Sequence, residues 1–576
     1  MYIKRPNGEG KWEGYMDRRE FLALLGTTGS IQLTGTAEGS LPTGGDIYPD
    51  LVKVAERAAE ESLPKQQADG GLRDEHEIPQ PGATAGFLSS LAALFLASES
   101  RHHRSPELLE RMERAAEHLV GVQHPDGAID LPTTNFGSPP DTAFVLEPLC
   151  VAAEVLRARK YPESRRLETT LETFIQRAAS ALTTGGIHTP NHRWVVVSAL
   201  ARCHHLFPDP RYLARLDQWL AEGIDLDEEG QFTERSTGIY NAITDRALLT
   251  AGRLLDRARL FEPVRKNLEA MIYFLHPNGE VATDISSRQD RFQSATLRPY
   301  YHAYRYMARY DRNGRFATVA NDLERDHLAQ LGGELIYFLE IPELRQDLPP
   351  LKALPTDYEK YYPLSGFVHI RRGERSATIL GGDSRLFSFR HGGAVVEAVR
   401  LASAFFGKGQ FSAPLKRSRS TYGLEQELEG YYLQPLDPTD RRRDGNWQAM
   451  PNSSRAHTNV CHLRSRVEIS ERENGFELSL NVGGTTGVPL AVEITLRPGG
   501  QLAGDALAPL PNLPDAYFLG EGFASYELAG RRLRIGPGFR HHSWTQLRGA
   551  EPRLQGVTLY LTGFTPLNKP LQLTAA

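Results

Sequence analysis

Residues 241–257 read NAITDRALLTAGRLLDR, and this stretch shows the pattern that decides the fold of the first half of the chain. Its apolar side chains recur every three or four residues, at Ala247, Leu248, Ala251, Leu254 and Leu255. At 3.6 residues per turn, this spacing places them along one stripe of a helix, with charged side chains opposite. The stretch therefore predicts an amphipathic helix that buries one face against other helices.

The same pattern recurs over residues 45 to 340. It predicts further helices at Ala83–Ser98, Pro106–Gly121, Thr142–Ala158, Val195–His205 and Phe261–Leu275. Glycine-containing breaks separate them at intervals of 44 to 59 residues, at Gly71, Gly127, Gly186, Gly230 and Gly279. One interval holds two antiparallel helices with their loops, so the pattern predicts helical hairpins that form an open solenoid or close into a toroid. The breaks would then gather at one end and shape a cleft.

The second half of the chain has a different pattern. Prolines interrupt the helical periodicity at residues 348–350 and 354–355, and we interpret residues 341–363 as a linker. From residue 364 to residue 576, apolar and polar side chains alternate in short runs such as 476–482, FELSLNV. This alternation, with glycine-bearing turns between the runs, predicts an antiparallel β-sandwich.

The first 37 residues predict a twin-arginine (Tat) export signal. Arg18 and Arg19 are followed by Glu20, Phe21 and Leu22, and no further charge occurs before Glu38. That uncharged run is too short and too rich in glycine and threonine to cross a membrane. We therefore expect a signal peptide at residues 1–37, a start at Met1 or Met16, and a periplasmic or secreted protein whose helical domain covers residues 38–340. The alternative is a surface helix that carries two arginines.

Composition limits the classes of function. The sequence is 40% hydrophobic and 24% charged, which is typical of globular domains. At 576 residues, the chain is too long to form one ordinary core. The net charge of -5 argues against a nucleic-acid partner but leaves room for a local basic cleft. The three cysteines form no zinc-finger or disulfide framework, and no nucleotide-binding motif occurs.

Three polar clusters beside the glycine breaks hold the candidate site residues. The first, residues 189–194 (TPNHRW), brings Asn191, His192, Arg193 and Trp194 to a predicted helix start. We predict that Arg193 and Trp194 bind substrate. An amide, an imidazole and a guanidinium at a cleft edge can bind a carboxylate and move a proton. The alternative is that Asn191 caps the helix and His192 packs in the core.

The second cluster, residues 230–241 (GQFTERSTGIYN), lies at another predicted loop-to-helix junction. A cationic environment supplied by Arg235 and Arg246 would lower the pKa of the Tyr240 phenol and let it act as acid or base. Glu234, Arg235 and Arg246 are also predicted substrate-binding residues. The alternative is a core tyrosine whose hydroxyl is satisfied by hydrogen bonding.

The third cluster, residues 276–289 (HPNGEVATDISSRQ), is a long polar loop between two predicted helices. Polar loops at the end of a repeat fold are often binding elements. We therefore predict that Asp284, Arg288 and Gln289 bind substrate, together with His302 beyond the loop. The alternative is a solvated loop without a ligand.

In this order, the three clusters and the α-then-β layout resemble the heparinase II/III and oligoalginate lyase superfamily of polysaccharide lyases. The resemblance implies a multidomain α then β fold, an incomplete (α/α) toroid followed by an antiparallel β-sandwich. It implies that Asn191 neutralises a substrate carboxylate and that His192 assists it or acts as base. Tyr240 would donate a proton to the leaving oxygen and, in a syn elimination, also act as base. A further site residue from the β domain is implied, and our candidate is His391; the alternative is an exposed turn histidine.

The sequence also departs from the family pattern. Arg193 follows His192 where the family often has glycine, and Asn241 follows Tyr240 where it often has histidine. The added arginine suggests a more charged site. Some relatives carry zinc in the β domain, and the histidines here that could serve it are His391, His457, His462, His541 and His542. They show no sharp ligand spacing, and the predicted reaction requires no cofactor.

We therefore predict a polysaccharide lyase that cleaves a uronic-acid-containing polysaccharide or oligosaccharide by β-elimination and leaves a C4–C5 double bond. The expected partner is an acidic glycan, without nucleic acid or a membrane span, and homo-oligomerisation stays open. One alternative is a glycoside hydrolase of the (α/α) toroid type acting on acidic oligosaccharides. It needs a carboxyl pair, drawn from Asp126, Asp141, Glu234 and Asp284. A non-catalytic glycan-binding protein and an epimerase are further alternatives.

Overall fold

The computed structural model describes residues 46–442 and 444–576, which form two compact units. The helical unit contains the described residues up to Ile272 together with Ser286–Leu354, and the β unit contains Tyr273–Ile285 and Pro355–Ala576. The predicted signal peptide at residues 1–37 lies outside the described residues. Within the described ranges, no helix combines the length and apolar character needed to cross a membrane.

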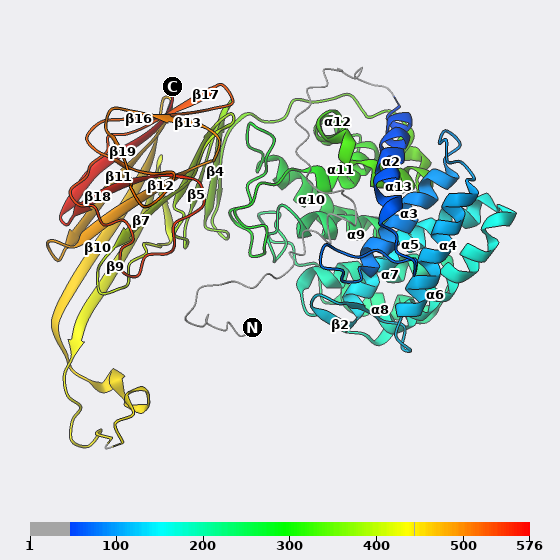
Figure 1. The fold of residues 1–576 in the computed structure, drawn as a ribbon, viewed down its shortest axis with the longest axis horizontal. Helices are drawn as coiled ribbons and strands as arrows, with labels where there is room; N and C mark the ends of the chain where they lie inside the picture. Colours follow the sequence, from blue (N-terminus) through cyan, green and yellow to red (C-terminus); the bar gives the residue numbers. More distant parts are fainter. Residues whose placement is uncertain (1–45, 443) are drawn as a thin grey trace. The chain divides into compact units, whose positions relative to one another are not determined.

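Pairs of antiparallel helices build the helical unit (Figure 1). The inner helices, each packed on the next, are α3 (Pro81–Leu96), α5 (Pro139–Arg159), α7 (Pro190–Leu206), α9 (Tyr240–Leu254) and α11 (Tyr301–Tyr310). Their outer partners are α4 (Pro106–Val122), α6 (Arg165–Thr184), α8 (Pro210–Ala221), α10 (Phe261–Ile272) and α12 (Gly314–His327). The helices α2 (Tyr48–Ser62) and α13 (Leu335–Glu340) pack against α3. This arrangement is the predicted incomplete (α/α) toroid.

Short elements join the helices of this unit. They are the 3-10 turns Leu63–Lys65, Pro162–Ser164, Ala258–Leu260, Arg298–Tyr300, Leu328–Gln330, Gly332–Glu334 and Pro342–Arg345, and the two-stranded ribbon β1 (Ile129–Leu131) and β2 (Asn135–Ser138). Inner helices such as α3 are buried on nearly all sides, because other helices flank them on both sides. Outer helices such as α4 bury one stripe only and begin at a clear signal, the Ser105 cap followed by Pro106.

The glycine breaks are repeated structural elements. Gly70 and Gly127 adopt left-handed φ values of +91° and +96°. A Cβ atom would lie 2.2 Å from the carbonyl oxygen of Arg114 at Gly70 and 2.0 Å from that of Arg177 at Gly127. Each turn thus packs directly on the backbone of an outer helix, α4 or α6, where only glycine fits.

The β unit is a sandwich of two sheets whose inner faces share one apolar core (Figure 1). In the described chain, one sheet has the order β13 (Gln501–Ala503), β16 (Ala524–Leu528), β17 (Arg531–Gly536), β19 (Leu567–Ala575), β11 (Gly475–Gly484), β10 (His457–Arg472), β9 (Thr421–Leu433), β8 (Leu415–Ser418). The other has the order β14 (Leu507–Pro509), β15 (Ala516–Leu519), β18 (Val557–Phe564), β12 (Pro489–Leu496), β7 (Ala394–Ser403), β6 (Phe387–His391), β5 (Arg375–Leu380), β4 (Phe367–Arg372), β3 (Asp357–Tyr362). Neighbouring strands are antiparallel except β15 and β18, so the predicted sandwich is confirmed.

Two boundaries differ from the sequence prediction. Strand β3 falls inside the predicted linker, and Tyr273–Ile285, predicted to be part of the helical domain, belongs to the β unit. The ring of Phe274 stacks on Phe367 with centroids 5.7 Å apart, and His276 Nδ1 lies 2.9 Å from Ser376 Oγ. These contacts span about 100 residues of sequence, which local periodicity cannot show.

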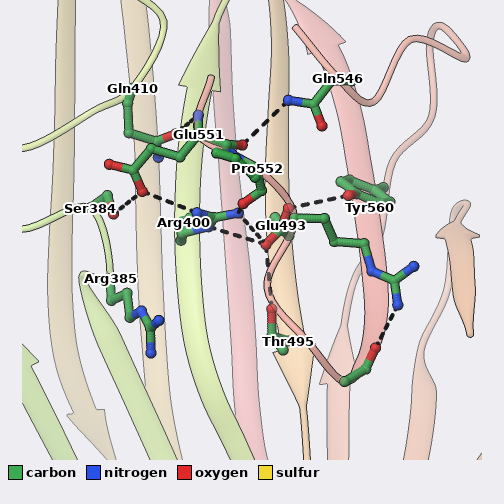
Figure 2. Close-up of polar contacts among 12 residues, drawn as sticks. Ser384, Arg385, Arg400, Gln410, Glu493, Thr495, Gln546, Glu551, Pro552 and Tyr560 are labelled. Atoms are coloured by element: carbon green, nitrogen blue, oxygen red, sulfur yellow. Dashed lines mark hydrogen bonds and ion pairs between the residues drawn. The ribbon is translucent and has the colours of Figure 1, made fainter. Parts of the chain in front are cut away.

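A buried ionic network joins strands of the nine-stranded sheet (Figure 2). The neighbours of its residues along β7 and β12 belong to the sandwich core, so the network lies on the opposite face of that sheet. Arg400 on β7 and Glu493 on β12 alternate with core residues, and Arg400 Nη2 donates to Glu493 Oε1 over 2.6 Å. Tyr560 donates to the other Glu493 oxygen, and Glu551 and the Pro552 carbonyl accept from Arg400. The segment carrying Glu551 and Pro552 thereby packs over Arg400, which is 3% exposed.

Candidate active site

Asn191 is held by a carboxylate from another helical hairpin. It is the second residue of α7, is 3% exposed, and its Nδ2 donates to Glu234 Oε2 over 2.6 Å. The residue at the N-cap is Thr189, so the alternative in which Asn191 caps the helix is wrong. Glu234 thus orients the Asn191 amide through one N–H. The second N–H of the same amide can donate to another acceptor.

Glu234 joins the second cluster to the third. Its Oε1 lies 3.3 Å from Arg288 Nε, and its backbone carbonyl accepts from the backbone N–H and the hydroxyl of Ser287, over 3.1 and 2.9 Å. Burial raises the pKa of this carboxyl, while Arg288 and Asn191 oppose the rise. Glu234 is therefore the central residue that connects Asn191 with Arg288.

Tyr240 is the first residue of α9 and is 2% exposed. Its hydroxyl oxygen accepts a hydrogen bond from Gln289 Nε2 over 2.7 Å, and the guanidinium of Arg288 lies 5.2 Å from the ring centroid. The hydroxyl oxygen therefore lies beside one hydrogen-bond donor, and a cation lies over the ring face. The Tyr240 hydroxyl is hydrogen-bonded, as the alternative of a core tyrosine expects, but its oxygen is the acceptor in that bond.

Asp290, which the sequence analysis did not select, positions this region. Its carboxylate accepts from Ser236 Oγ over 3.0 Å and from the backbone N–H of Gly238 over 2.9 Å. Ser236 Oγ in turn accepts from the Tyr240 backbone N–H over 3.0 Å. The contact joins residues 52 to 54 positions apart, so no local signal in the sequence distinguishes this aspartate from others in the polar loop.

His192 is fully buried at the start of α7. Its ring lies 4.7 Å from the exposed ring of His188 and 6.1 Å from that of Phe144, in edge-on contacts. The packing alternative therefore describes the position of His192 in this structure. His188, in the loop before α7, was not selected from the sequence.

Arg193 and Trp194 are corrections to the predicted substrate-binding set. Trp194 is fully buried and donates its indole N–H to Asp225 Oδ1 over 2.8 Å, so no face of the ring is open to a sugar. Arg193 lies over the Trp194 ring and pairs with Asp225 and Glu222, each at 3.2 Å. The charge that Arg193 adds to the sequence is neutralised locally, so it does not make the site more cationic.

Arg235 and Arg246 do not supply the field at Tyr240. Arg235 lies 3.7 Å from the carboxylate of Asp227. Arg246 lies six residues further along α9, on the order of 9 Å deeper in the toroid, and pairs with Glu334. The predicted residue His302 lies 3.4 Å from the same Glu334. The cation beside Tyr240 is Arg288.

Asp284 and His391, also predicted for the site, belong to the β unit. Asp284 accepts from Thr378 Oγ1 over 2.9 Å, and burial raises its pKa. His391 is the last residue of β6, with Nδ1 3.1 Å from the Arg532 carbonyl oxygen. Their roles toward substrate stay predictions. Among residues 46–442 and 444–576, no three His, Cys, Asp or Glu side chains converge as metal ligands, so the zinc prediction gains no ligand set.

The two units define the class of architecture, an (α/α) toroid followed by an antiparallel β-sandwich. The chain is similar over 97% of its length to the chondroitin AC lyase of Streptomyces coelicolor A3 in complex with chondroitin sulphate, covering 82% of that chain at 15% identity and a TM-score of 0.55. It is similar over 97% of its length to heparinase III, covering 89% of that chain at 10% identity and a TM-score of 0.54. It also resembles a Paenibacillus xanthan lyase, over 97% of this chain and 59% of that one, at 10% identity and a TM-score of 0.55.

These structures confirm the predicted resemblance to the heparinase II/III-like lyases at the level of the fold. Identities of 10 to 15% show a shared fold and nothing finer. No protein-family model and no curated protein matches the sequence.

Proposed function

We propose that this protein is a polysaccharide lyase that cleaves a uronic-acid-containing glycan by β-elimination. The observation that carries the proposal is the network of Asn191, Glu234, Arg288 and Tyr240, which combines a hydrogen-bonding amide, a cation and a phenol. The shared fold with enzymes named as chondroitin, heparin and xanthan lyases supports it. The proposal includes export through the predicted twin-arginine signal, which would bring the enzyme to polymers outside the cytoplasm.

The first requirement of the reaction is neutralisation of the uronate carboxylate. The C5 proton is only weakly acidic while the neighbouring carboxylate is fully charged. The second N–H of Asn191 would donate to that carboxylate, and Arg288 would add a positive charge. Donors already held in place stabilise the enolate-like transition state without reorganisation at the moment of reaction.

The second requirement is transfer of one proton. In the proposed syn elimination, the Tyr240 phenolate takes the proton from C5, and the electron pair of that C–H bond forms the C4–C5 double bond. The C4–O bond breaks, its electrons move to the leaving oxygen, and Tyr240 returns the proton to that oxygen. Gln289 donates to the Tyr240 oxygen and Arg288 lies over its ring, so both would hold the phenol in place through the cycle. No cofactor takes part in this sequence.

The hydrolase alternative needs two opposed carboxyl groups, and the structure does not favour it. Asp141 is bound by Ser138 and Asn135 at the start of α5, and Asp126 accepts from the backbone of its own turn. Glu234 is bound by Asn191 and Arg288. Both Glu234 oxygens are thus engaged by side chains of the network, and neither faces a leaving oxygen alone.

The deciding experiment follows the ultraviolet absorbance of the C4–C5 double bond in purified protein mixed with alginate, glucuronan, ulvan, heparan and chondroitin polymers. Increasing absorbance with one of them establishes the lyase and names its polymer. New reducing ends without absorbance would make the protein a hydrolase. Binding without any product, or exchange of the C5 proton alone, would make it a binding protein or an epimerase.

A further inference from the structure

A cavity of about 520 Å³, open to solvent on one side, lies in the helical unit. Inner helices line it with Phe144 on α5, Ser198 on α7 and Ala242 on α9. Gly238 and Ile239, the two residues before Tyr240, also contribute to its wall. The cavity therefore adjoins the candidate site.

The interior of the toroid is closed below this cavity. The helices α7 and α9 begin beside the site, and residues further along them lie deeper at 1.5 Å per residue. Four residues beyond Ser198, the buried guanidinium of Arg202 lies 2.8 Å from the carboxylates of Glu147 and Glu340. Arg253 pairs with Glu340 as well. This ion-pair network gives the cavity a floor.

The charged groups that line the cavity are not equivalent. Glu334 pairs with Arg246, and Glu147 pairs with Arg202. Arg298 is different: its Nη1 is shielded from solvent and has no hydrogen-bond partner among the described residues. Burial lowers the pKa of Arg298, and no acidic group opposes that shift. Arg298 as a whole is partly exposed, but a shielded guanidinium nitrogen without a partner is costly, so an anion in the cavity would complete it.

We propose that this cavity binds an acidic sugar residue of the glycan, with the carboxylate or sulfate group of that residue on Arg298. The volume lies in the range of small-molecule sites, roughly 300–1,000 Å³. Gln293, Ser294 and Thr296 on the wall carry amide and hydroxyl groups that suit sugar hydroxyls. The inference rests on the proposed function for the identity of the glycan, since it deepens that function by adding a second recognition point beside the reacting sugar.

The test is calorimetric titration of the full chain with glucuronate, glucose 6-sulfate and glucose. We expect an acidic sugar to bind and glucose to bind at least about tenfold more weakly, the usual value of a charge-assisted hydrogen bond. Which acidic sugar binds distinguishes the carboxylate from the sulfate. Arg298→Gln should weaken that binding at least about tenfold, and Arg298→Lys should restore part of it. Arg315→Gln, which removes an arginine of α12 paired with Glu269, is the matched control and should bind like the wild type.

Thermal unfolding separates a binding role from a structural one. If Arg298 serves a ligand, Arg298→Gln should not lower the melting temperature of the free protein, because the substitution removes an unpaired buried charge. Equal affinity for glucose and the acidic sugars, or unchanged affinity in Arg298→Gln, would overturn the inference. A chain that binds acidic sugar through Arg298 but yields no unsaturated product would keep this inference and lose the lyase proposal. An active lyase whose Arg298→Gln variant keeps its KM and its sugar affinity would keep the lyase proposal and overturn this inference.

Discussion

Asn191 Nδ2 lies 2.6 Å from Glu234 Oε2, although the two residues are 43 positions apart and belong to different helical hairpins. This contact orients an amide at the start of α7 by a carboxylate from the loop before α9. Since Glu234 also contacts Arg288, one carboxylate sets the positions of the two groups proposed to neutralise the substrate. Three of the predictions below concern this network and the ion pairs beneath it.

Replacing Tyr240 by Phe tests the proposed acid and base directly. The substitution removes only a hydroxyl whose contact is with Gln289, so we expect kcat to fall by about 10³-fold or more with an unchanged melting temperature. The assay is the initial rate of absorbance increase on the polymer that the wild type cleaves. Tyr310→Phe, at a half-exposed position on α11, is the matched control and should keep full activity. Substantial turnover by Tyr240→Phe would remove Tyr240 from the mechanism.

We predict that ionisation of the Glu234 carboxyl has opposite effects on activity and on stability. Burial raises its pKa, and the site needs the ionised form to hold Arg288 and Asn191. Activity should therefore fall as the pH falls through this raised value. Glu234→Gln should lack that acidic limb in its pH–rate profile and be about tenfold slower at neutral pH, a loss of about 1.4 kcal/mol.

The stability effect of Glu234 has the reverse sign. A carboxyl whose pKa is raised by folding contributes stability below its unfolded pKa and loses it as the pH rises through its folded pKa. At neutral pH, Glu234→Gln should then unfold at a higher urea concentration than the wild type, and the difference should vanish in acid. A Gln variant that is less stable at neutral pH would mean that the Arg288 contact outweighs the burial of Glu234.

Glu340 should control the acid stability of the helical unit. Burial opposes its ionisation, but Arg202 and Arg253 lower its pKa to about 2. Its stabilising contribution is therefore present above the ordinary glutamate pKa of about 4.3 and is lost as the pH falls toward 2. We expect Glu340→Gln to cost about 3–5 kcal/mol at neutral pH, because it leaves buried arginines unpaired, and much less in acid.

Urea unfolding followed by the helical circular dichroism signal measures this effect. Asp326→Asn, which breaks the exposed pair with Arg325 on α12, is the control and should cost at most about 1 kcal/mol. Equal effects of the two substitutions would show that the network beneath the cavity does not stabilise the toroid.

The network of Figure 2 predicts that substitutions of Arg400 and Glu493 have non-additive effects on the stability of the β unit. Glu493→Leu should destabilise the unit by about 3–5 kcal/mol, since Arg400 would stay buried without its main counter-charge. The double variant Arg400→Leu with Glu493→Leu should cost less than the single one, because it removes both charges. Urea midpoints of Glu493→Leu, Arg400→Leu and the double variant, compared with the wild type in a double-mutant cycle, measure the coupling. Additive losses would contradict the coupling.

The sequence by itself predicted the order of the architecture, because helices and strands have their own periods of 3.6 and 2 residues. The stripe in residues 241–257 became α9, and the alternation in 476–482 became the core face of β11. Asn191 and Tyr240 could be selected because both lie at helix starts beside glycine breaks, where ligands are commonly bound. These signals are local, so they can be recognised in the sequence without knowledge of the fold.

The tertiary structure alone decided which charges meet. Arg246 was the expected cation near Tyr240, yet Arg288 lies over the ring, while Arg246 pairs with Glu334 88 residues away. Trp194 and Arg193 were predicted to bind substrate, but Asp225 binds both of them. Asp290 and Arg298 had no distinguishing neighbours in the sequence. Coulomb interactions and desolvation depend on distances between groups that folding brings together from distant parts of the chain, and residue order does not record those distances.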